Sequence, residues 1–302
     1  MDSAQPKIAL VTGATGFVGS HLARRLVRDG WQVHVVVRPD SELAQLREAA
    51  GHVTVHRHDG TTQGLIDIVR EASPQIVFHL ASLFISEHQP ADVEPLIRSN
   101  LLFGTQLLEA MAVNGTVRLV NAGTSWQHYQ GGDYNPVNLY AATKQAFEDI
   151  LRFYVEARQI RAITLKLFDT YGPDDPRPKL VSLLARFAAS GEALDMSPGE
   201  QLLDLVYIDD VVEAFVMAGH RTAAGSSPLF ESYGVSSGET VTLREFAGIF
   251  SELTGKRLDL RWGKRSYRAR EVMTPWSGPP LPGWRAAHSL RSGLRLTLRG
   301  LQ

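Results

Sequence analysis

The sequence contains no cysteine, which excludes disulfide bonds, zinc sites built on thiolates and cysteine nucleophiles. It also has no excess of one charge, because 31 Lys and Arg residues are matched by 32 Asp and Glu residues. Such a balance gives neither the basic footprint of a nucleic-acid-binding protein nor a basic membrane anchor. No apolar run approaches the roughly 20 residues of a membrane-spanning helix, and the polar start MDSAQPK is unlike a signal peptide. We therefore expect a cytoplasmic protein without nucleic-acid or membrane partners.

What the first half does contain is an alternation of short β-branched runs with longer helical patterns. The expected strands are 7–11, 32–37, 53–57, 75–80, 117–122 and 161–168. The expected helices are 17–29, 62–72, 91–113 and 138–158. Strands that alternate with helices indicate a parallel sheet covered by helices on both faces. The sequence therefore predicts an α/β fold, with a Rossmann-type doubly wound parallel sheet over residues 1–168.

The alternation stops after Phe168, where the segment DTYGPDDPRPKL is rich in Pro, Gly and Asp and is typical of a loop. A helix near 179–190 and a turn-rich tail follow it. We expect residues 169–302 to form a smaller α+β domain. Its segment near 204–236 is expected to return and pack on the first domain.

Three glycines follow the first strand directly. Gly13, Gly16 and Gly19 are spaced three apart between an expected strand and an expected helix. Glycine is needed where the backbone turns tightly, approaches a pyrophosphate and packs a helix closely on a sheet. The amino end of the helix then attracts phosphate groups. A simple tight turn is the alternative, but the position after the first strand favours dinucleotide binding.

The second strand ends in VVVRPDS, with Arg38 where an NADH-binding protein has an acidic residue. A guanidinium there suits the 2′-phosphate of NADPH, although a solvated arginine is the alternative. We expect NADPH rather than NADH. Asp59, after the third strand, is expected to bind the adenine amino group. His56 and His58 resemble a metal-binding pair, but no third ligand is evident, so no metal site is expected.

Tyr140 and Lys144 lie four residues apart on an expected helix and therefore share one face. A tyrosine with a pKa near 10 is a poor proton relay at neutral pH. A neighbouring cation favours the phenolate and makes the tyrosine usable as an acid or base. Thr124 and Ser125 follow the fifth strand, at the edge where ligands bind in open α/β sheets.

In these features the sequence resembles the extended short-chain dehydrogenases/reductases, the NAD-dependent epimerase/dehydratase family. The resemblance covers nearly the whole chain. It rests on TGATGFVG, the turn at Asp59, HLAS, Asn100 in SNLLFGTQLLEA, YAATK, LKLFDTYGP, DLVYIDDV and GVSSGETVTLREFA. SWQHY followed by YNPVNLYAATKQAFE is most similar to the reductases of 4-keto-6-deoxy sugars. Among them are the CDP-abequose and CDP-paratose synthases and the dTDP-4-keto-6-deoxyhexose 4-ketoreductases.

The resemblance implies that Tyr140 protonates the substrate oxygen and that Lys144 also holds the nicotinamide ribose. Ser125, four residues before Tyr129, is the expected substrate-polarising hydroxyl, with Thr124 as the alternative. Residues implied to bind the cofactor are Gly13, Thr15, Gly16, Phe17, Val18, Gly19, Arg38, Asp59, Gly60, Leu80, Ala81, Ser82, Asn100, Tyr140 and Lys144.

Asn100 matches a position that bends its helix and helps to relay protons in the family. An asparagine that only satisfies local backbone groups is the alternative.

The second domain is implied to bind the nucleotide-diphosphate sugar. Residues expected to contact the substrate are Ser125, Trp126, Gln127, His128, Asp169, Arg177, Lys179 and Arg270. Two positions depart from the family, which often has Asn in place of Asp169 and Arg in place of Leu203. An acid at residue 169 would repel a diphosphate, so the nucleotide base, CDP or dTDP, stays open.

The residues after Ser125 disfavour dehydration, because family dehydratases have Asp-Glu directly after the Ser/Thr and Trp126 and Gln127 stand there instead. Three other activities are compatible with the sequence. We expect an NADPH-dependent reduction of the C4 ketone of a nucleotide-diphosphate-4-keto-6-deoxyhexose. A 4-epimerase with tightly held NAD and a non-catalytic NAD(P)-binding sensor are the alternatives. The family resemblance also implies a homodimer.

Overall fold

The computed structural model describes residues 7–225 and 229–299. Its chain forms two compact units, each assembled from separate stretches. The first unit comprises residues 1–124, 138–166 and 212–233. The second comprises residues 125–137, 167–211 and 234–302. Residues 212–233, part of the segment expected to return, belong to the first unit, and residues 125–137 belong to the second.

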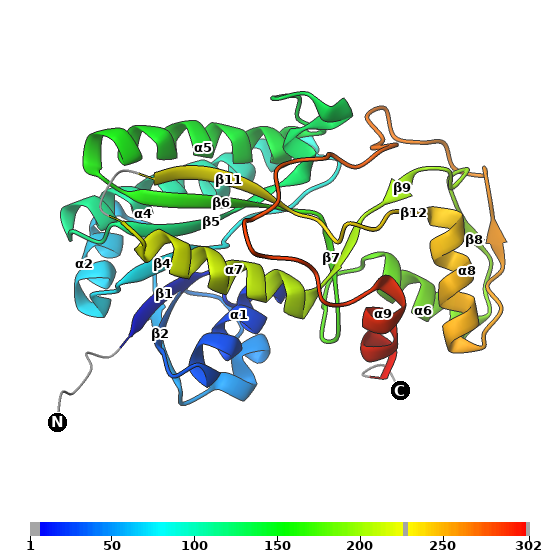
Figure 1. Cartoon of the computed structure of the whole chain (residues 1–302), viewed down its shortest axis with the longest axis horizontal. Coiled ribbons are helices and arrows are strands. Elements are labelled where there is room, and N and C mark those ends of the chain that lie inside the picture. The colour runs from blue at the N-terminus through cyan, green and yellow to red at the C-terminus, as the bar shows by residue number, and fades with distance from the viewer. Residues whose placement is uncertain (1–6, 226–228, 300–302) are drawn as a thin grey trace. The chain divides into compact units, whose positions relative to one another are not determined.

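A seven-stranded sheet forms the centre of the first unit (Figure 1). Its strands are β1 (Ile8–Thr12), β2 (Gln32–Val37), β3 (Val53–Arg57), β4 (Ile76–His79), β5 (Arg118–Thr124), β6 (Arg161–Leu167) and β11 (Leu229–Val235). The strand order is β11-β6-β5-β4-β1-β2-β3. Parallel pairing joins β3 to β2, β2 to β1, β1 to β4 and β4 to β5. The expected strands and the Rossmann-type fold are confirmed, and β11 is an addition whose sequence LFESYGV includes half-buried polar residues and a glycine.

Helices cover both faces of this sheet because its strands are apolar on both sides. They are α1 (Phe17–Arg28), α2 (Thr62–Ala72), α4 (Phe103–Val113), α5 (Leu139–Arg158) and α7 (Ile208–Ala223). Helices α2, α4 and α5 share one apolar core with the sheet. Figure 1 shows α1 and α7 on the opposite face, where Arg25 and Glu213 join them by an ion pair of 2.8 Å.

The expected helix at 91–113 is interrupted. A short helix, α3 (Val93–Ile97), passes into a π-helical turn at Arg98–Leu102 before α4 begins. Such π turns insert a residue into a helix and often occur at functional sites. The turn contains Asn100, whose side chain is buried.

The second unit is built from short strand pairs and three described helices. The strands are β7 (Asp169–Tyr171), β8 (Leu194–Asp195), β9 (Leu202–Leu203), β10 (Leu205–Tyr207), β12 (Val241–Thr242) and β13 (Leu260–Arg261). The helices are α6 (Leu180–Ser190), α8 (Leu243–Thr254) and α9 (Leu290–Arg299). Helix α8 begins with a capping box between Thr242 and Glu245 and ends at Gly255, whose φ of 65° is the left-handed conformation that terminates helices.

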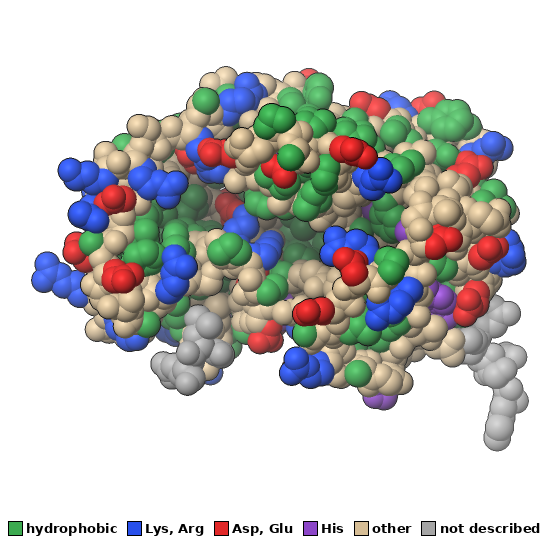
Figure 2. Space-filling view, turned by 180° about the vertical axis from the view of Figure 1, so that it is seen from behind, with side chains coloured by type: hydrophobic (Ala, Val, Ile, Leu, Met, Phe, Trp, Pro, Cys, Tyr) green, Lys and Arg blue, Asp and Glu red, His purple; other side chains and the backbone are tan. Residues whose placement is uncertain are grey.

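Acidic and basic side chains are interspersed over the face seen in Figure 2, as the balanced composition predicts. Over residues 7–225 and 229–299, none of the helices is long and apolar enough to span a bilayer.

Candidate active site

The first unit contains a cavity of about 600 Å³ beside the glycine turn. Gly13 has a φ of 74°, and a Cβ atom there would lie 2.6 Å from the backbone N of Ala81. A Cβ atom on Gly19 would lie 2.1 Å from the carbonyl oxygen of Gly13. Both positions therefore require glycine, one for its conformation and contact with the next loop and the other for packing α1 against the turn.

The turn fits a pyrophosphate group. Helix α1 starts after Gly16 with no side-chain cap and no acidic residue in its first turn, so its positive end is left for an anion. Gly13, Thr15 and Gly16 all line the cavity. A dinucleotide bound here would therefore place its pyrophosphate at this turn.

The other end of the cavity carries the residues expected at the adenosine. The Arg38 side chain is 82% exposed and lies 3.6 Å from Asp40. Asp59 accepts hydrogen bonds from the backbone N and hydroxyl of Thr61, at 2.9 and 2.8 Å, which lower the pKa of its carboxyl group. The Arg38 side chain thus makes a long, exposed ion pair that a phosphate can replace, and both Arg38 and Asp59 line the cavity.

Most of the predicted cofactor residues lie around this cavity. Those that line it are Gly13, Thr15, Gly16, Arg38, Asp59, Gly60, Leu80, Ala81 and Ser82. Phe17 and Gly19 are buried within α1, and Val18 is half-buried. Asn100, Tyr140 and Lys144 are outside the lining of this cavity.

Asn100 fastens the loop after β4 to helix α5. Its side-chain oxygen accepts hydrogen bonds from Ser82 Oγ at 3.2 Å and from the backbone N of Leu83 at 2.8 Å. Its amide donates to the Leu83 carbonyl oxygen at 3.0 Å and to Thr143 Oγ1 at 2.9 Å. The side chain is thus fully engaged in positioning a cavity loop against the helix that bears Tyr140.

The Tyr140–Lys144 pair occupies the first turns of α5. Asn138 caps this helix by accepting a hydrogen bond from the backbone N of Ala141. Tyr140 is half-buried, and the ring of Phe84 lies edge-on to it with ring centroids 5.0 Å apart. Lys144 is buried, and desolvation lowers its pKa to about 8 although Glu148 opposes the shift. A cation thus lies one helical turn from a phenol, as the spacing predicts.

The two histidines that resembled a metal pair have other partners. The His56 ring stacks on the ring of His34, with Nε2 2.9 Å from His34 Nδ1. His58 is buried beside Phe103, and this burial lowers its pKa. Within the described ranges, no cluster of three or more His, Asp or Glu side chains is placed to hold a metal ion.

Ser125 begins a short segment of the second unit that lines a small cavity of about 60 Å³. Trp126 and His128 line it as well, whereas Gln127 is buried outside it. The His128 ring stacks on the ring of Trp276, with centroids 4.0 Å apart and planes 10° apart. An aromatic floor of this kind suits the apolar face of a sugar ring. Thr124, the alternative hydroxyl, is buried at the end of β5 in the first unit.

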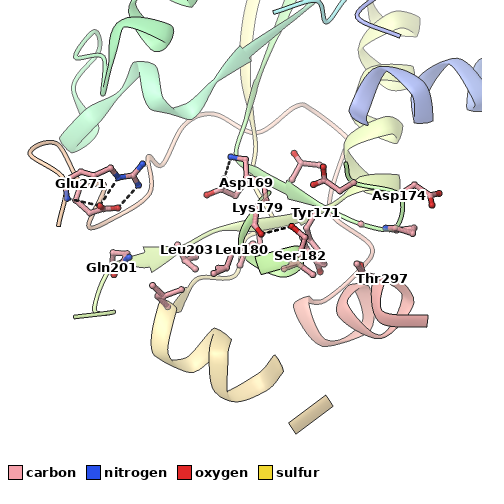
Figure 3. Close-up of a pocket in the computed structure, with 18 residues that line it drawn as sticks. Asp169, Tyr171, Asp174, Lys179, Leu180, Ser182, Gln201, Leu203, Glu271 and Thr297 are labelled. Carbon is pink, nitrogen blue, oxygen red and sulfur yellow. Dashed lines mark hydrogen bonds and ion pairs between the residues drawn. The ribbon is translucent and has the colours of Figure 1, made fainter. Parts of the chain in front are cut away.

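A larger cavity of about 310 Å³ opens beside β7 in the second unit (Figure 3). Lys179 Nζ lies 3.7 Å from Asp169 Oδ1 at its centre. Arg268 Nη2 lies 2.9 Å from Glu271 Oε1 at one end of it. Each acid that lines this part of the cavity is therefore paired with a base, and Asp169 does not present an unbalanced negative charge.

Besides the buried Gln127, two predicted substrate residues, Arg177 and Arg270, lie outside the lining of these cavities. Arg177 binds Asp175 and the carbonyl oxygen of Thr170. Arg270 packs over the ring of Tyr129 and donates to Asn135.

Three residues that the sequence did not single out line the cavities of the second unit: Arg268, Glu271 and Trp276. Residues 256–270 are rich in Lys and Arg, but composition does not say which arginine faces a cavity. The spacing Arg-x-x-Glu, an ion pair within one turn of chain, is the signal that would have favoured Arg268.

Comparisons with known proteins agree with this arrangement. CDP-abequose synthase from Salmonella muenchen is 25% identical over 303 aligned residues, which cover 97% of each chain. UDP-glucose 4-epimerase from Mycolicibacterium smegmatis is 28% identical over 320 aligned residues, 96% of each chain. The crystal structure of Thermus thermophilus UDP-glucose 4-epimerase in complex with NAD superposes with a TM-score of 0.81 at 27% identity, covering 97% of this chain and 98% of that one.

A family model described as the NAD dependent epimerase/dehydratase family matches residues 9–230. This match covers most of the chain, including the glycine turn, the Tyr140–Lys144 pair and the loop after β6. The protein therefore belongs to the NAD-dependent epimerase/dehydratase family, the extended short-chain dehydrogenases/reductases.

Proposed function

We propose that the protein reduces the C4 ketone of a nucleotide-diphosphate-4-keto-6-deoxyhexose to the alcohol with NADPH. The observation that carries this proposal is the Tyr140–Lys144 pair on α5, in the same unit as the dinucleotide cavity. Similarity to CDP-abequose synthases from Salmonella muenchen and Yersinia pseudotuberculosis supports it.

The residues of the chain supply the proton and the stabilisation of charge. Tyr140 donates its phenolic proton to the oxygen that becomes an alkoxide, and the Lys144 ammonium stabilises the phenolate that remains. Ser125 donates a hydrogen bond to the same substrate oxygen. Reduced nicotinamide, when bound, supplies the hydride that C4 receives.

Arg38 supports NADPH as the cofactor. Its guanidinium lines the adenosine end of the cavity, where an arginine can bind the 2′-phosphate that distinguishes NADPH from NADH. The neighbouring Asp40 is its ion-pair partner at 3.6 Å and is the residue nearest to the acid that NADH would require. NADH therefore remains the less favoured cofactor.

Reversing the charge at Arg38 tests this choice. A charged hydrogen bond contributes about 1.5–3 kcal/mol, so Arg38→Asp should raise the KM for NADPH by about tenfold or more. The KM for NADH should change by less than about threefold, because NADH has no 2′-phosphate. Arg70→Asp, on the exposed face of α2, is the control for an equal change in net charge. An unchanged NADPH-to-NADH ratio would remove Arg38 from the phosphate site.

The second unit supports the nucleotide-diphosphate part of the proposal. Lys179 and Arg268 line its larger cavity, and both ammonium and guanidinium groups bind phosphate oxygens. Asp169 and Glu271 hold these cations in the cavity through ion pairs. A diphosphate would take over those cations when it binds.

A 4-epimerase is the second candidate, because epimerases from Mycolicibacterium smegmatis and Thermus thermophilus are among the relatives. An epimerase must retain NAD and reoxidise its intermediate within one turnover. Dehydration is disfavoured because Trp126 packs against Arg268 and Gln127 is buried, and neither side chain is an acid or base.

Mixing the purified protein with NADPH and a panel of CDP- and dTDP-4-keto-6-deoxyglucose separates the candidates. Loss of nicotinamide absorbance in proportion to the sugar supports the reductase. Isomerised sugar without net oxidation of NADPH would replace it with the epimerase, and binding without turnover would replace it with a sensor.

A further inference from the structure

Three charged side chains are buried together in the first unit, and one of them is Lys144 of the Tyr140–Lys144 pair. Lys144 is 4% exposed, and Glu148 and Lys166 are each 5% exposed. A buried charge is costly unless an opposite charge or hydrogen bonds compensate for it. The proposed function uses only Lys144, so the burial of the other two charges calls for an explanation.

Glu148 is the acid that both lysines share. It lies one turn after Lys144 on the buried side of α5, so the two side chains are neighbours. Lys166 reaches it from β6, with Nζ 3.6 Å from Glu148 Oε2. The arrangement is therefore two cations around one carboxylate, and burial leaves little solvent to screen the charges.

Burial disfavours the protonated form of Lys144, and the Glu148 carboxylate favours it. Desolvation lowers the pKa of Lys144 and the Glu148 carboxylate opposes the shift, which together leave the pKa at about 8. A further loss of protonation would leave Tyr140 without the cation that stabilises its phenolate. The same desolvation lowers the pKa of Lys166, and Glu148 opposes that shift too.

The other titratable groups around Lys144 do not supply negative charge. His79 on β4 is neutral, because burial and the nearby Lys144 lower its pKa to about 3, and its Nδ1 is 2.8 Å from Thr12 Oγ1. Glu109 on α4 accepts a hydrogen bond from Tyr154, further along α5. Among residues 7–225 and 229–299, Glu148 is thus the acid that acts on Lys144.

We propose that Glu148 is a positioning residue for catalysis, whose buried carboxylate keeps Lys144 protonated while Lys166 holds that carboxylate in place. The role of Lys144 in this proposal rests on the proposed function. The electrostatic coupling among the three side chains does not, and it is measurable without a substrate.

Lysine NMR tests the coupling directly. The chain has six lysines, so protein labelled with ¹³C at lysine Cε gives a simple spectrum in which each signal follows its own protonation. Lys144→Arg and Lys166→Arg assign the two buried signals. In the native protein the Lys144 signal should titrate near pH 8.

Two substitutions should move the Lys144 titration in opposite directions. Glu148→Gln removes the acid and should lower the Lys144 pKa by about one unit or more. Lys166→Met removes the competing cation and should raise it. Glu109→Gln, which removes the acid bonded to Tyr154 on the same helix, is the matched control and should leave it unchanged.

A Glu148 carboxylate that acts on Lys166 alone would not give opposite shifts at Lys144. If Glu148→Gln does not fold, Glu148→Asp and Lys166→Met still decide the matter, because a shorter carboxylate should lower the Lys144 pKa and loss of Lys166 should raise it. A Lys144 titration that is the same in every folded variant would overturn the proposal.

Kinetics separate this proposal from the proposed function. In an active reductase, the alkaline limb of kcat against pH should move with the Lys144 titration in each variant. Opposite NMR shifts in a protein that reduces no nucleotide sugar would overturn only the proposed function. Normal reduction with an unmoved Lys144 signal would overturn only the role of Glu148.

Discussion

Each unit contains an ion pair between a lysine and a carboxylate with almost the same N–O distance, but one pair is buried and the other is partly exposed. In the first unit, Lys166 lies 3.6 Å from Glu148 and both side chains are only 6% exposed. In the second, Lys179 lies 3.7 Å from Asp169 with exposures of 34% and 43%. Breaking a buried pair costs about 3–5 kcal/mol, whereas an exposed pair contributes about 0–1 kcal/mol. The buried pair therefore fixes charges permanently, and the exposed one leaves its lysine available to a ligand.

The largest effect is expected at Tyr140, one helical turn from the buried Lys144. Tyr140→Phe should lower kcat by about 10²–10⁴-fold, since general acid catalysis contributes that much. Cofactor affinity, measured by fluorescence titration, should be retained. Phe84→Leu removes the ring that contacts Tyr140 without removing a proton donor, and should cost far less. A fully active Tyr140→Phe protein would show that the proton comes from elsewhere.

The next largest effect is expected in the open cavity of the second unit. Arg268→Met should raise the KM for the nucleotide sugar by about 10–100-fold, because a charged hydrogen bond to phosphate contributes about 1.5–3 kcal/mol. Arg270→Met, two residues away and directed at Tyr129, is the matched control and should change the KM by less than about threefold. The reverse order of effects would restore Arg270 as the diphosphate ligand.

The buried Lys144 ammonium should lower the free energy of unfolding, although activity requires it. Its pKa in the folded protein, about 8, lies below the ordinary value of 10.5, so the folded state holds this proton less tightly than the unfolded chain. The cost to stability is therefore full below about pH 8 and disappears as the pH rises to about 10.5. Lys144→Met should raise the free energy of unfolding by about 1–3 kcal/mol at pH 7, because Glu148 keeps Lys166 as its partner.

Urea unfolding of both proteins from pH 7 to pH 10 measures this difference. We expect the advantage of Lys144→Met to shrink as the pH rises through this range. A difference that stays constant or grows with pH would contradict a depressed pKa at Lys144.

The smallest effect is expected from the exposed pair. Asp169→Asn should change the free energy of unfolding by less than about 0.5 kcal/mol, as is usual for exposed ion pairs. Its effect should be on substrate binding, where an amide repels a diphosphate less than a carboxylate does, so the KM should fall a few-fold. Loss of stability as large as that of Glu148→Gln would remove the contrast between the two pairs.

Features that depend on neighbouring residues along the chain could be predicted from the sequence. The glycine turn follows from the conformations needed at Gly13 and Gly19, and the Tyr140–Lys144 pair follows from helical spacing. The strands of the sheet were recognisable because their β-branched residues are buried on both faces. Local pattern therefore predicted the fold of the first unit and the placement of Tyr140 and Lys144 on one helix.

Features set by distant segments could not be predicted in this way. Trp276 meets His128 and Arg268 meets Trp126 although these partners lie far apart in the sequence, so no local pattern reports the contacts. The pairing of Asp169 with Lys179 could not be predicted either, because only the fold brings the two side chains to 3.7 Å. The buried Glu148 was likewise indistinguishable from an exposed helical acid until its contact with Lys166 was known.

The central claim, reduction of a C4 ketone with a proton from Tyr140, is tested most directly by isotope transfer. NADPH carrying deuterium at both C4 positions of the nicotinamide is incubated with the protein and CDP-4-keto-6-deoxyglucose, and the product is analysed by NMR. The account predicts one deuterium at C4 of the sugar for each NADPH oxidised, and a transfer rate at least about 10²-fold lower with Tyr140→Phe. Isomerised sugar that carries no deuterium, or deuterium transfer at the native rate in Tyr140→Phe, would contradict it.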